Sequence, residues 1–199
     1  MREVQAARGT SIAPSEGSAT SGSTRLRLLF AVVMVGGLTL DIVTKIIAVE
    51  RLEPAAPVRL LGGLLTLRLI RNPGAAFSQG ETITPVFGIA AIGVLLFVIL
   101  KLVPKLGHRG WAVALGLLCA GVSGNLVDRL FRRPGVLRGH VVDFFQLPHF
   151  AIFNVADMCI TTAAVMIMIL AVIKNVAVTG ERYVRVKREP KARLKPDDG

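Results

Sequence analysis

The chain has 199 residues, of which 52% are hydrophobic and only 19% are charged, and its mean hydropathy is +0.60. A soluble domain of this length cannot bury so much apolar surface in one core, so the expected solvent for the excess is lipid. The net charge is +11, but only 6% of the residues are aromatic, too few for the base-stacking surfaces of a nucleic-acid-binding protein. The composition therefore argues against a soluble enzyme, a disordered chain and a nucleic-acid partner.

Apolar blocks divide the chain into a membrane domain and two polar ends. Residues 1–24 are rich in Ser, Ala, Gly and Thr and lack periodicity, which predicts a disordered leader. Four blocks follow, each reaching the roughly 20 residues that a membrane-spanning helix requires. They are Leu28–Ala48, Thr84–Leu102, Gly110–Leu130 and Ala151–Ile173. We therefore predict an all-α membrane protein with four helices over residues 25–173, followed by a basic, solvated tail over residues 174–199.

The first apolar block has an alternative interpretation as a cleavable signal peptide. Its apolar core, Leu28–Leu40, follows Arg25 and Arg27, as the core of a signal peptide follows a basic segment. Apolar residues resume after Asp41 and Lys45, however, and no small-residue cleavage site follows promptly. We therefore favour a helix that is retained.

The first loop between apolar blocks has a strand pattern. Leu65, Leu67 and Leu69 alternate with other residues, and Gly62-Gly63 provides a turn before them. Asn72-Pro73-Gly74 then breaks the pattern. The sequence therefore predicts a small β element in this loop.

Basic residues predict how the bundle lies in its membrane. With four spans, the N-terminal segment, the 101–109 connection and the tail share one side, and they carry four, three and eight of the 24 Lys and Arg residues. The positive-inside rule makes this side cytoplasmic. The loops 49–83 and 131–150 then face outward, although the second of them carries three arginines.

Two of the four aspartates at membrane depth have basic neighbours. A carboxylate at this depth is costly and by default indicates function. Asp41 shares a helix face with Lys45, which favours a structural ion pair and leaves substrate positioning as an alternative. Asp128 precedes Arg129, which favours a second structural pair. Asn125 can share their face without a charge to pair, so it is the better candidate for contacting a substrate backbone.

Asp143 and Asp157 have the stronger functional signal. Asp143 is flanked by apolar residues just before the last block, where an N-cap role is the alternative. Asp157 shares a helix face with Asn154 and has no basic residue within a turn. If the two carboxyl groups meet, they share one proton and divide acid and base work, as in aspartic proteases. The pairing is a hypothesis, because 14 residues separate them.

Five segments together resemble the lipoprotein signal peptidase (signal peptidase II) family, and they occur in the family's order within residues 26–173. They are Asp41-Ile-Val-Thr44-Lys45, Asn72-Pro-Gly-Ala-Ala-Phe77-Ser78, Gly124-Asn125-Leu-Val-Asp128-Arg129, Val142-Asp143-Phe144 and Phe153-Asn154-Val-Ala156-Asp157. The resemblance implies a four-helix membrane aspartyl endopeptidase with a small extracytoplasmic β element. Such an enzyme removes prolipoprotein signal peptides by cutting just before a diacylglyceryl-modified cysteine, and it is the target of the antibiotic globomycin.

The same resemblance implies roles for individual residues. By motif match the catalytic pair is Asp143 and Asp157. Substrate-binding positions fall on Asn125, Arg129, Asn154, Asn72 and Asp41, and supporting positions fall on Asp128 and Lys45.

Location and partners also follow from the resemblance. We expect a monomer in the bacterial cytoplasmic membrane, in contact with membrane lipids, with both termini cytoplasmic and the active site near the outer leaflet. We expect no cofactor and no metal, because HExxH, GxxxxGK[ST] and Cys/His clusters are absent from the sequence.

Two other functions remain as alternatives. Gly121-Val122-Ser123-Gly124 resembles the motif of rhomboid serine proteases, but His108, His140 and His149 all lie outside the apolar blocks, where they offer the serine no base. The second alternative is a small transporter or membrane chaperone that uses its buried acids as a proton relay.

Overall fold

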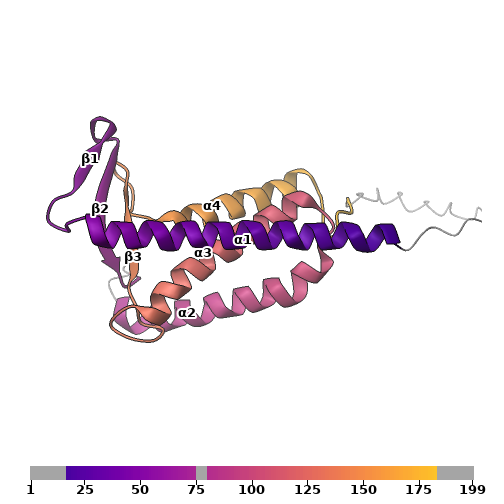
Figure 1. Ribbon diagram of the computed structural model, residues 1–199, viewed down its shortest axis with the longest axis horizontal. Coiled ribbons are helices and arrows are strands. Elements are labelled where there is room, and N and C mark those ends of the chain that lie inside the picture. Colours follow the sequence, from indigo (N-terminus) through magenta and orange to yellow (C-terminus); the bar gives the residue numbers. More distant parts are fainter. Residues whose placement is uncertain (1–16, 75–79, 183–199) are drawn as a thin grey trace, which may run out of the picture.

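The computed structural model describes residues 17–74 and 80–182, and its four long helices form a bundle (Figure 1). The helices are α1 (Gly17–Arg51), α2 (Gly80–Phe97), α3 (Arg109–Phe131) and α4 (Val155–Met168). Two π-helical turns, Val98–Leu102 and Ile169–Ile173, continue α2 and α4, and the 3-10 turn Val103–Lys105 follows the first of them. Each of the four predicted apolar blocks therefore coincides with a helix that is long and apolar enough to cross a membrane.

Helix α1 begins earlier than the sequence indicates. Residues 17–24 belong to the helix, although a disordered leader is expected over 1–24. These Ser, Thr and Gly residues have weak helix propensity, but extending an existing helix costs much less than nucleating one. The remainder of the leader, the motif residues 75–79 and the tail beyond residue 182 lie outside the described residues.

Helix α3 is the central helix of the bundle. In its most apolar stretch 61% of the residues are buried, against 11% in the corresponding stretches of α1 and α2. Glycines let its neighbours approach: a Cβ atom at Gly124 would lie 2.3 Å from Oδ2 of Asp41, and one at Gly121 would lie 2.3 Å from the carbonyl oxygen of Ala156. Small residues allow such close approach in membrane bundles, and here they bring α1 and α4 against the same helix.

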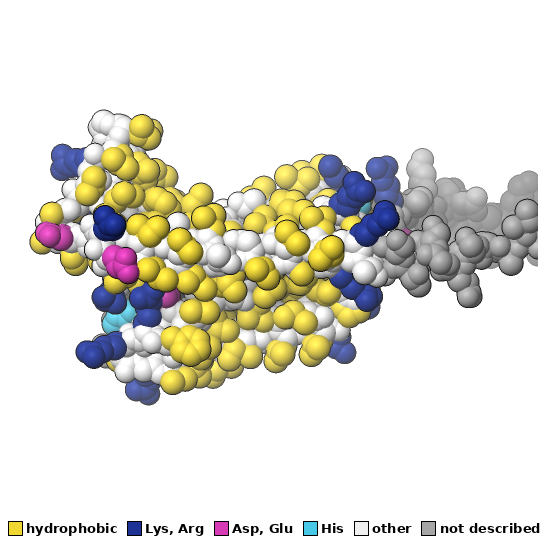
Figure 2. All heavy atoms as spheres, in the orientation of Figure 1, with side chains coloured by type: hydrophobic (Ala, Val, Ile, Leu, Met, Phe, Trp, Pro, Cys, Tyr) yellow, Lys and Arg dark blue, Asp and Glu magenta, His cyan; other side chains and the backbone are white. Residues whose placement is uncertain are grey.

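The outer surface of the bundle is apolar along its middle. Figure 2 shows hydrophobic side chains over the helices of the visible face, with Lys and Arg toward both ends. Val32 and Val35 of α1 and Leu96 and Phe97 of α2 are all exposed. This pattern suits lipid, whereas in water so large an apolar surface would promote association. The chain is a multi-pass membrane protein.

A three-stranded antiparallel sheet lies at one end of the bundle (Figure 1). Its strands, in spatial order, are β1 (Val58–Leu60), β2 (Leu65–Asn72) and β3 (Val141–Gln146). The small β element predicted from the sequence is confirmed, and it is a hairpin, since Val58 of β1 pairs with Leu67 of β2. Gly62 and Gly63 form its turn with φ angles of 67° and 97°, which glycine adopts without strain.

The third strand, β3, is absent from the expectations drawn from the sequence. Its first four residues are all buried, so they lack the polar–apolar alternation that identifies a strand. Asp143 of β3 pairs with Ile70 of β2, so the alternative of an N-cap role for Asp143 is wrong. The N-cap of α4 is Asn154.

The opposite end of the bundle holds both ends of the described chain (Figure 1). The Gly107 N–H donates to the carbonyl oxygen of Val178 at 2.9 Å, and the Arg27 guanidinium donates to that of Pro104 at 3.1 Å. The 101–109 connection therefore meets the beginning of α1 and the segment after α4. This is the arrangement that an even number of spans predicts.

Candidate active site

One buried side chain connects Asp143 and Asp157. Asn154 caps α4 through a capping box, in which its Oδ1 accepts from the Asp157 N–H at 3.0 Å and its own N–H donates to Asp157 Oδ2 at 3.1 Å. The Asn154 Nδ2 atom donates to Asp143 Oδ1 at 2.6 Å. Because Asn154 is fully buried, this one residue fixes the two carboxyl groups relative to each other where β3 meets the beginning of α4.

Two further amides orient the same carboxyl groups. Asn72, the last residue of β2, donates through Nδ2 to Asp143 Oδ2 at 2.8 Å. Asn125 of α3 donates through Nδ2 to Asp157 Oδ1 at 2.9 Å. Every carboxyl oxygen of the pair therefore accepts an N–H bond, and β2, β3, α3 and α4 all contribute to the site.

Burial alters the acidity of Asp143, which lies in the sheet and is only 3% exposed. Removal from water raises the pKa of this carboxyl group to about 6. The hydrogen bonds from Asn72 and Asn154 act against this shift, and the nearby charge of Asp157 adds to it. Asp157 is more exposed than Asp143, so the two carboxyl groups occupy different environments.

Lys45 forms ion pairs with two buried carboxylates beside the catalytic pair. Its Nζ atom lies 2.8 Å from Asp41 Oδ2 and 2.9 Å from Asp128 Oδ2, and all three side chains are at most 3% exposed. The predicted pair between Asp41 and Lys45 is therefore confirmed. Lys45 also donates to Asn125 Oδ1 at 3.1 Å, which links this charge cluster to the amide that binds Asp157.

The prediction that Asp128 pairs with Arg129 is wrong. The partners of Asp128 are Lys45 on α1 and Arg132, four residues farther along the chain. Residues four apart share a helix face, whereas consecutive residues point in different directions. Asp128 Oδ2 also accepts from the Val142 N–H at 3.1 Å, so this carboxylate holds β3 against α3.

Asp41 holds the beginning of α4 in place. Its Oδ1 atom accepts from the Ala156 N–H at 2.8 Å. This is one of the N–H groups that a helix N-terminus leaves without an intrahelical partner, and a negative charge is favourable there. Because Asp157 is the next residue, Asp41 acts on the position of the site through the backbone of α4.

Arg129 has donors available near the pair. Its Nη1 atom donates to the Asn125 carbonyl oxygen at 3.3 Å, and its guanidinium lies 5.8 Å from the ring centroid of Phe87 on α2. Within the described part of the chain, the buried Nε atom has no hydrogen-bond partner. The guanidinium lies close enough to interact electrostatically with Asp128, Asp143 and Asp157.

The structure therefore gathers every site residue named from the sequence, and it adds two more. Arg132 completes the charge cluster, and the i,i+4 spacing from Asp128 is a signal that could have revealed it. Thr84 of α2 donates to the carbonyl oxygen of Pro73, next to Asn72, and a local pattern gives no sign of this long-range contact.

Sequence comparisons give one consistent family. A family model described as signal peptidase (SPase) II matches residues 33–173. The lipoprotein signal peptidase of Rhodococcus jostii (strain RHA1) is 45% identical over 147 residues, which cover 74% of each chain. That of Mycobacterium tuberculosis (strain ATCC 25618 / H37Rv) is 45% identical over 157 residues, which cover 79% of this chain and 77% of the relative.

Solved structures agree with the fold. One structure of a bacterial membrane enzyme matches with a TM-score of 0.63 and 27% identity, covering 78% of this chain and 94% of that one. A second structure, also of a bacterial membrane enzyme, matches with a TM-score of 0.57 and 29% identity, covering 72% and 92%.

Proposed function

The chain belongs to the signal peptidase II family of proteases, and from this membership and its site we propose that it removes signal peptides from prolipoproteins, cutting just before a diacylglyceryl-modified cysteine. The observation that carries the proposal is the buried Asn154, whose hydrogen bonds hold Asp143 and Asp157 together at the end of the bundle that bears the sheet. Membership in a protease family built on this fold decides against a rhomboid serine protease and a proton-relay transporter.

In the proposed reaction the two carboxyl groups divide the proton transfers. Asp157, the more exposed group, takes a proton from water as the water oxygen adds to the scissile carbonyl carbon. Asp143, whose pKa is raised by burial, gives its proton to the carbonyl oxygen. The resulting diol collapses when the cysteine nitrogen gains a proton from Asp157 and the C–N bond breaks. Asp143 recovers its proton from the diol, so the site returns to its initial state.

The remaining polar residues position these groups and the substrate. Asn72, Asn125 and Asn154 fix the carboxyl groups through the bonds described above. Arg129, a half-buried residue beside the pair, offers its guanidinium Nη groups to a substrate carbonyl oxygen. Asp41 and Lys45 support the site from α1, one through the beginning of α4 and the other through Asn125.

The proposed substrate reaches the site from within the lipid bilayer. The enzyme acts as a monomer in the bacterial cytoplasmic membrane, and the signal helix enters the site sideways from lipid while its acyl chains stay among the lipid tails. Burial of acyl methylenes contributes about 0.8 kcal/mol each at most. The reaction consumes water, so the scissile bond lies near the outer leaflet. The sheet that carries Asp143 lies at one end of the bundle (Figure 1), and we assign this end to the outer leaflet from the distribution of Lys and Arg.

A matched pair of peptides tests the proposed function. Purified protein in detergent is offered a peptide with a diacylglyceryl-modified cysteine and a twin that lacks the lipid. Cleavage before the cysteine in the lipidated peptide alone is expected. Failure to cleave the lipidated peptide would remove the proposal, and equal cleavage of both peptides would remove the lipid requirement.

The acidity of Asp143 predicts a pH dependence. If Asp143 must be protonated to act as the acid, kcat/KM falls as the pH rises through the pKa of about 6, because the proton is then lost. Initial rates with the lipidated peptide at low substrate concentration measure this profile. A kcat/KM value that stays constant from about pH 5 to pH 8 would contradict the assignment of the acid.

The charge distribution predicts the orientation of the bundle. Both termini and the 101–109 connection lie in the cytoplasm, because these segments carry most of the Lys and Arg residues. A reporter enzyme that folds only outside the cytoplasm is expected to be inactive when fused after Asn175 and active when inserted after Gly62, in the turn of the sheet. An active reporter after Asn175 would overturn the four-span orientation.

A further inference from the structure

A basic pocket of about 620 Å³ lies where the beginning of α1 meets the beginning of α3, at the end of the bundle opposite the sheet (Figure 1). Arg25 of α1 lines it, together with His108 and Arg109 at the beginning of α3. Figure 2 shows Lys and Arg side chains gathered at this end of the bundle. The pocket shares no residue with the hydrogen-bonded network around the two aspartates, so it is a separate site.

The apolar lining of this pocket belongs to the packed core. Leu106 is 3% exposed and is part of the buried cluster that contains Trp111, and Leu26 packs against the same cluster. The guanidinium of Arg27 donates to the carbonyl oxygen of Pro104 at 3.1 Å, which ties the beginning of α1 to the 101–109 connection. The two elements that supply the pocket's arginines are therefore held together, and the pocket is preformed.

The charge of the pocket is positive. None of the described residues that line it is acidic. Arg25 and Arg109 are exposed, and neither takes part in an ion pair within residues 17–74 and 80–182. The Nδ1 atom of His108 accepts from the Gly110 N–H at 3.1 Å, so the neutral ring carries its proton on Nε2 and offers a third donor. Arginine presents a planar fork of donors that matches a phosphate, so the pocket has the chemistry of a phosphate site.

Arg25 lies at the end of a lipid-facing surface on α1. Leu28, Val32 and Val35 follow it on the same helix face, because the spacings are three or four residues. These three apolar side chains are 63%, 61% and 61% exposed, which suits contact with lipid tails. The rise from Arg25 to Leu28 is only about 4.5 Å. A phospholipid whose acyl chains lie along this face therefore has its phosphate at the level of Arg25.

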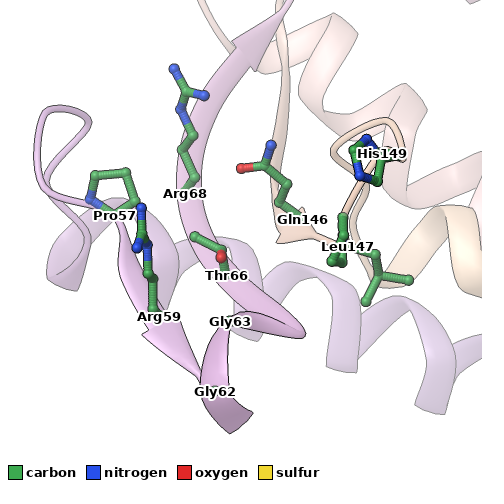
Figure 3. A pocket seen from close by; sticks show the side chains of 10 residues that line it. Pro57, Arg59, Gly62, Gly63, Thr66, Arg68, Gln146, Leu147 and His149 are labelled. Atoms are coloured by element: carbon green, nitrogen blue, oxygen red, sulfur yellow. The ribbon is translucent and has the colours of Figure 1, made fainter.

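Another basic pocket, of about 520 Å³, lies on the sheet and lacks this relation to lipid (Figure 3). Arg59 and Arg68 line it, beside Thr66 and Gln146. Strands and their connecting segments form this pocket, and none of its described lining residues belongs to a membrane-spanning helix. The pocket between α1 and α3 differs because its basic charge adjoins an exposed apolar helix face.

We infer that the pocket between α1 and α3 binds the phosphate of an anionic phospholipid, in the leaflet that faces the cytoplasm under the proposed orientation. Basic pockets between membrane helices on this side bind such headgroups. The chain's own ends fit the pocket less well, because residues 183–199 carry six Lys and Arg against three Asp and Glu, and residues 1–16 carry two of each. A lipid bound there connects α1 to α3 and stabilises the folded bundle.

Lipid-dependent stability of the full-length protein tests this inference. Purified protein in detergent receives increasing amounts of phosphatidylglycerol or of phosphatidylcholine, and its melting temperature is followed. Native mass spectrometry of the same samples counts the lipids that each protein retains. We expect phosphatidylglycerol to raise the melting temperature to a plateau, and phosphatidylcholine to raise it less. Added salt should weaken the effect of phosphatidylglycerol, because exposed charges are screened.

The double variant Arg25→Gln/Arg109→Gln connects the lipid effect to the pocket. It is expected to raise the phosphatidylglycerol concentration at half effect about tenfold to thirtyfold, because each arginine near a membrane surface contributes about fivefold. Its melting temperature without lipid should match wild type, since both side chains are exposed and break no ion pair among the described residues. The basic tail is present in both proteins, so its own attraction to lipid does not contribute to the difference.

Two control variants remove the same amount of charge elsewhere. Arg59→Gln/Arg68→Gln removes two arginines from the pocket on the sheet (Figure 3). Lys101→Gln/Lys174→Gln removes two exposed charges near the ends of α2 and α4, outside the pocket between α1 and α3. Both controls are expected to keep the half-effect concentration of wild type.

Each other outcome overturns the inference. Equal stabilisation by the two lipids shows that the protein does not select an anionic headgroup. Equal stabilisation by inorganic phosphate shows that the pocket binds a free anion. A control variant that loses as much affinity as Arg25→Gln/Arg109→Gln shows that only total charge matters. If the pocket variant melts early without lipid, native mass spectrometry decides, and an unchanged number of retained phosphatidylglycerol molecules contradicts the inference. None of these measurements uses peptide cleavage, so they are independent of the proposed function.

Discussion

Replacing either Asp143 or Asp157 by asparagine is expected to abolish turnover of the lipidated peptide while the protein still folds. Asparagine keeps the size of the side chain and part of its hydrogen bonding but cannot transfer a proton. General acid–base assistance alone contributes about 10²–10⁴-fold, and loss of water activation adds to this. Folding should survive, because asparagine keeps one acceptor oxygen and because neither aspartate has a basic ion-pair partner among the described residues, so no ion pair is broken. Single-turnover rates and melting temperatures in detergent measure the two effects.

The double variant Asp143→Asn/Asp157→Asn tests whether the two aspartates act together. The double variant should be scarcely slower than either single variant, because residues that act as a unit are lost together. The variant Cys119→Ala/Cys159→Ala should remain active, since both thiols are buried and lie outside the network. Substantial cleavage by a well-folded Asp143→Asn or Asp157→Asn enzyme would contradict the assignment and direct attention to Asp128.

Replacing Lys45 by methionine is expected to lower the free energy of unfolding by about 3–5 kcal/mol. Lys45 is 1% exposed and lies within 2.9 Å of carboxylate oxygens of both Asp41 and Asp128. Without it, the ion-pair partner that remains among the described residues is Arg132, which contacts Asp128 and leaves Asp41 without a cation. Thermal unfolding of the purified variant in detergent measures the loss, and peptide cleavage below the melting temperature reports any effect through Asn125.

A second substitution shows whether charge is the cause. In Lys45→Met/Asp41→Asn the uncompensated carboxylate is gone and Asp128 keeps Arg132, so most of the lost stability should return. Arg138→Met, at an exposed position, should stay within about 0.5 kcal/mol of wild type. A Lys45→Met protein that melts like wild type, or a double variant no more stable than the single, would contradict the role of the buried charges.

Local patterns were sufficient to predict the helices and part of the sheet. Lipid requires long apolar helices, so four apolar blocks locate four spans. The hairpin follows from alternating residues and Gly62-Gly63, because positive φ angles favour glycine. The pair between Asp41 and Lys45 follows from its i,i+4 spacing. In each case, residues close in sequence determine the feature.

Contacts between distant segments could not be predicted in this way. Asp128 pairs with Lys45 because glycines bring α1 against α3, and no local pattern encodes that approach. Strand β3 is buried from its first residue, so its sequence lacks the alternation that marks a strand. Asn154 was recognised as a site residue only by family resemblance. Its bond to Asp143 requires β3 to lie beside the first turn of α4.

The central claim is that Asp143 and Asp157 together activate a water molecule for cleavage before a lipidated cysteine. Its most direct test is single-turnover cleavage of a lipidated prolipoprotein in H₂¹⁸O, with Asp143→Asn/Asp157→Asn as the background and mass spectrometry of both products. We predict one product that begins with the diacylglyceryl-modified cysteine, one signal peptide with a single ¹⁸O in its new carboxyl group, and no products from the double variant. A cut at another bond, or equal product from the double variant, would contradict the claim.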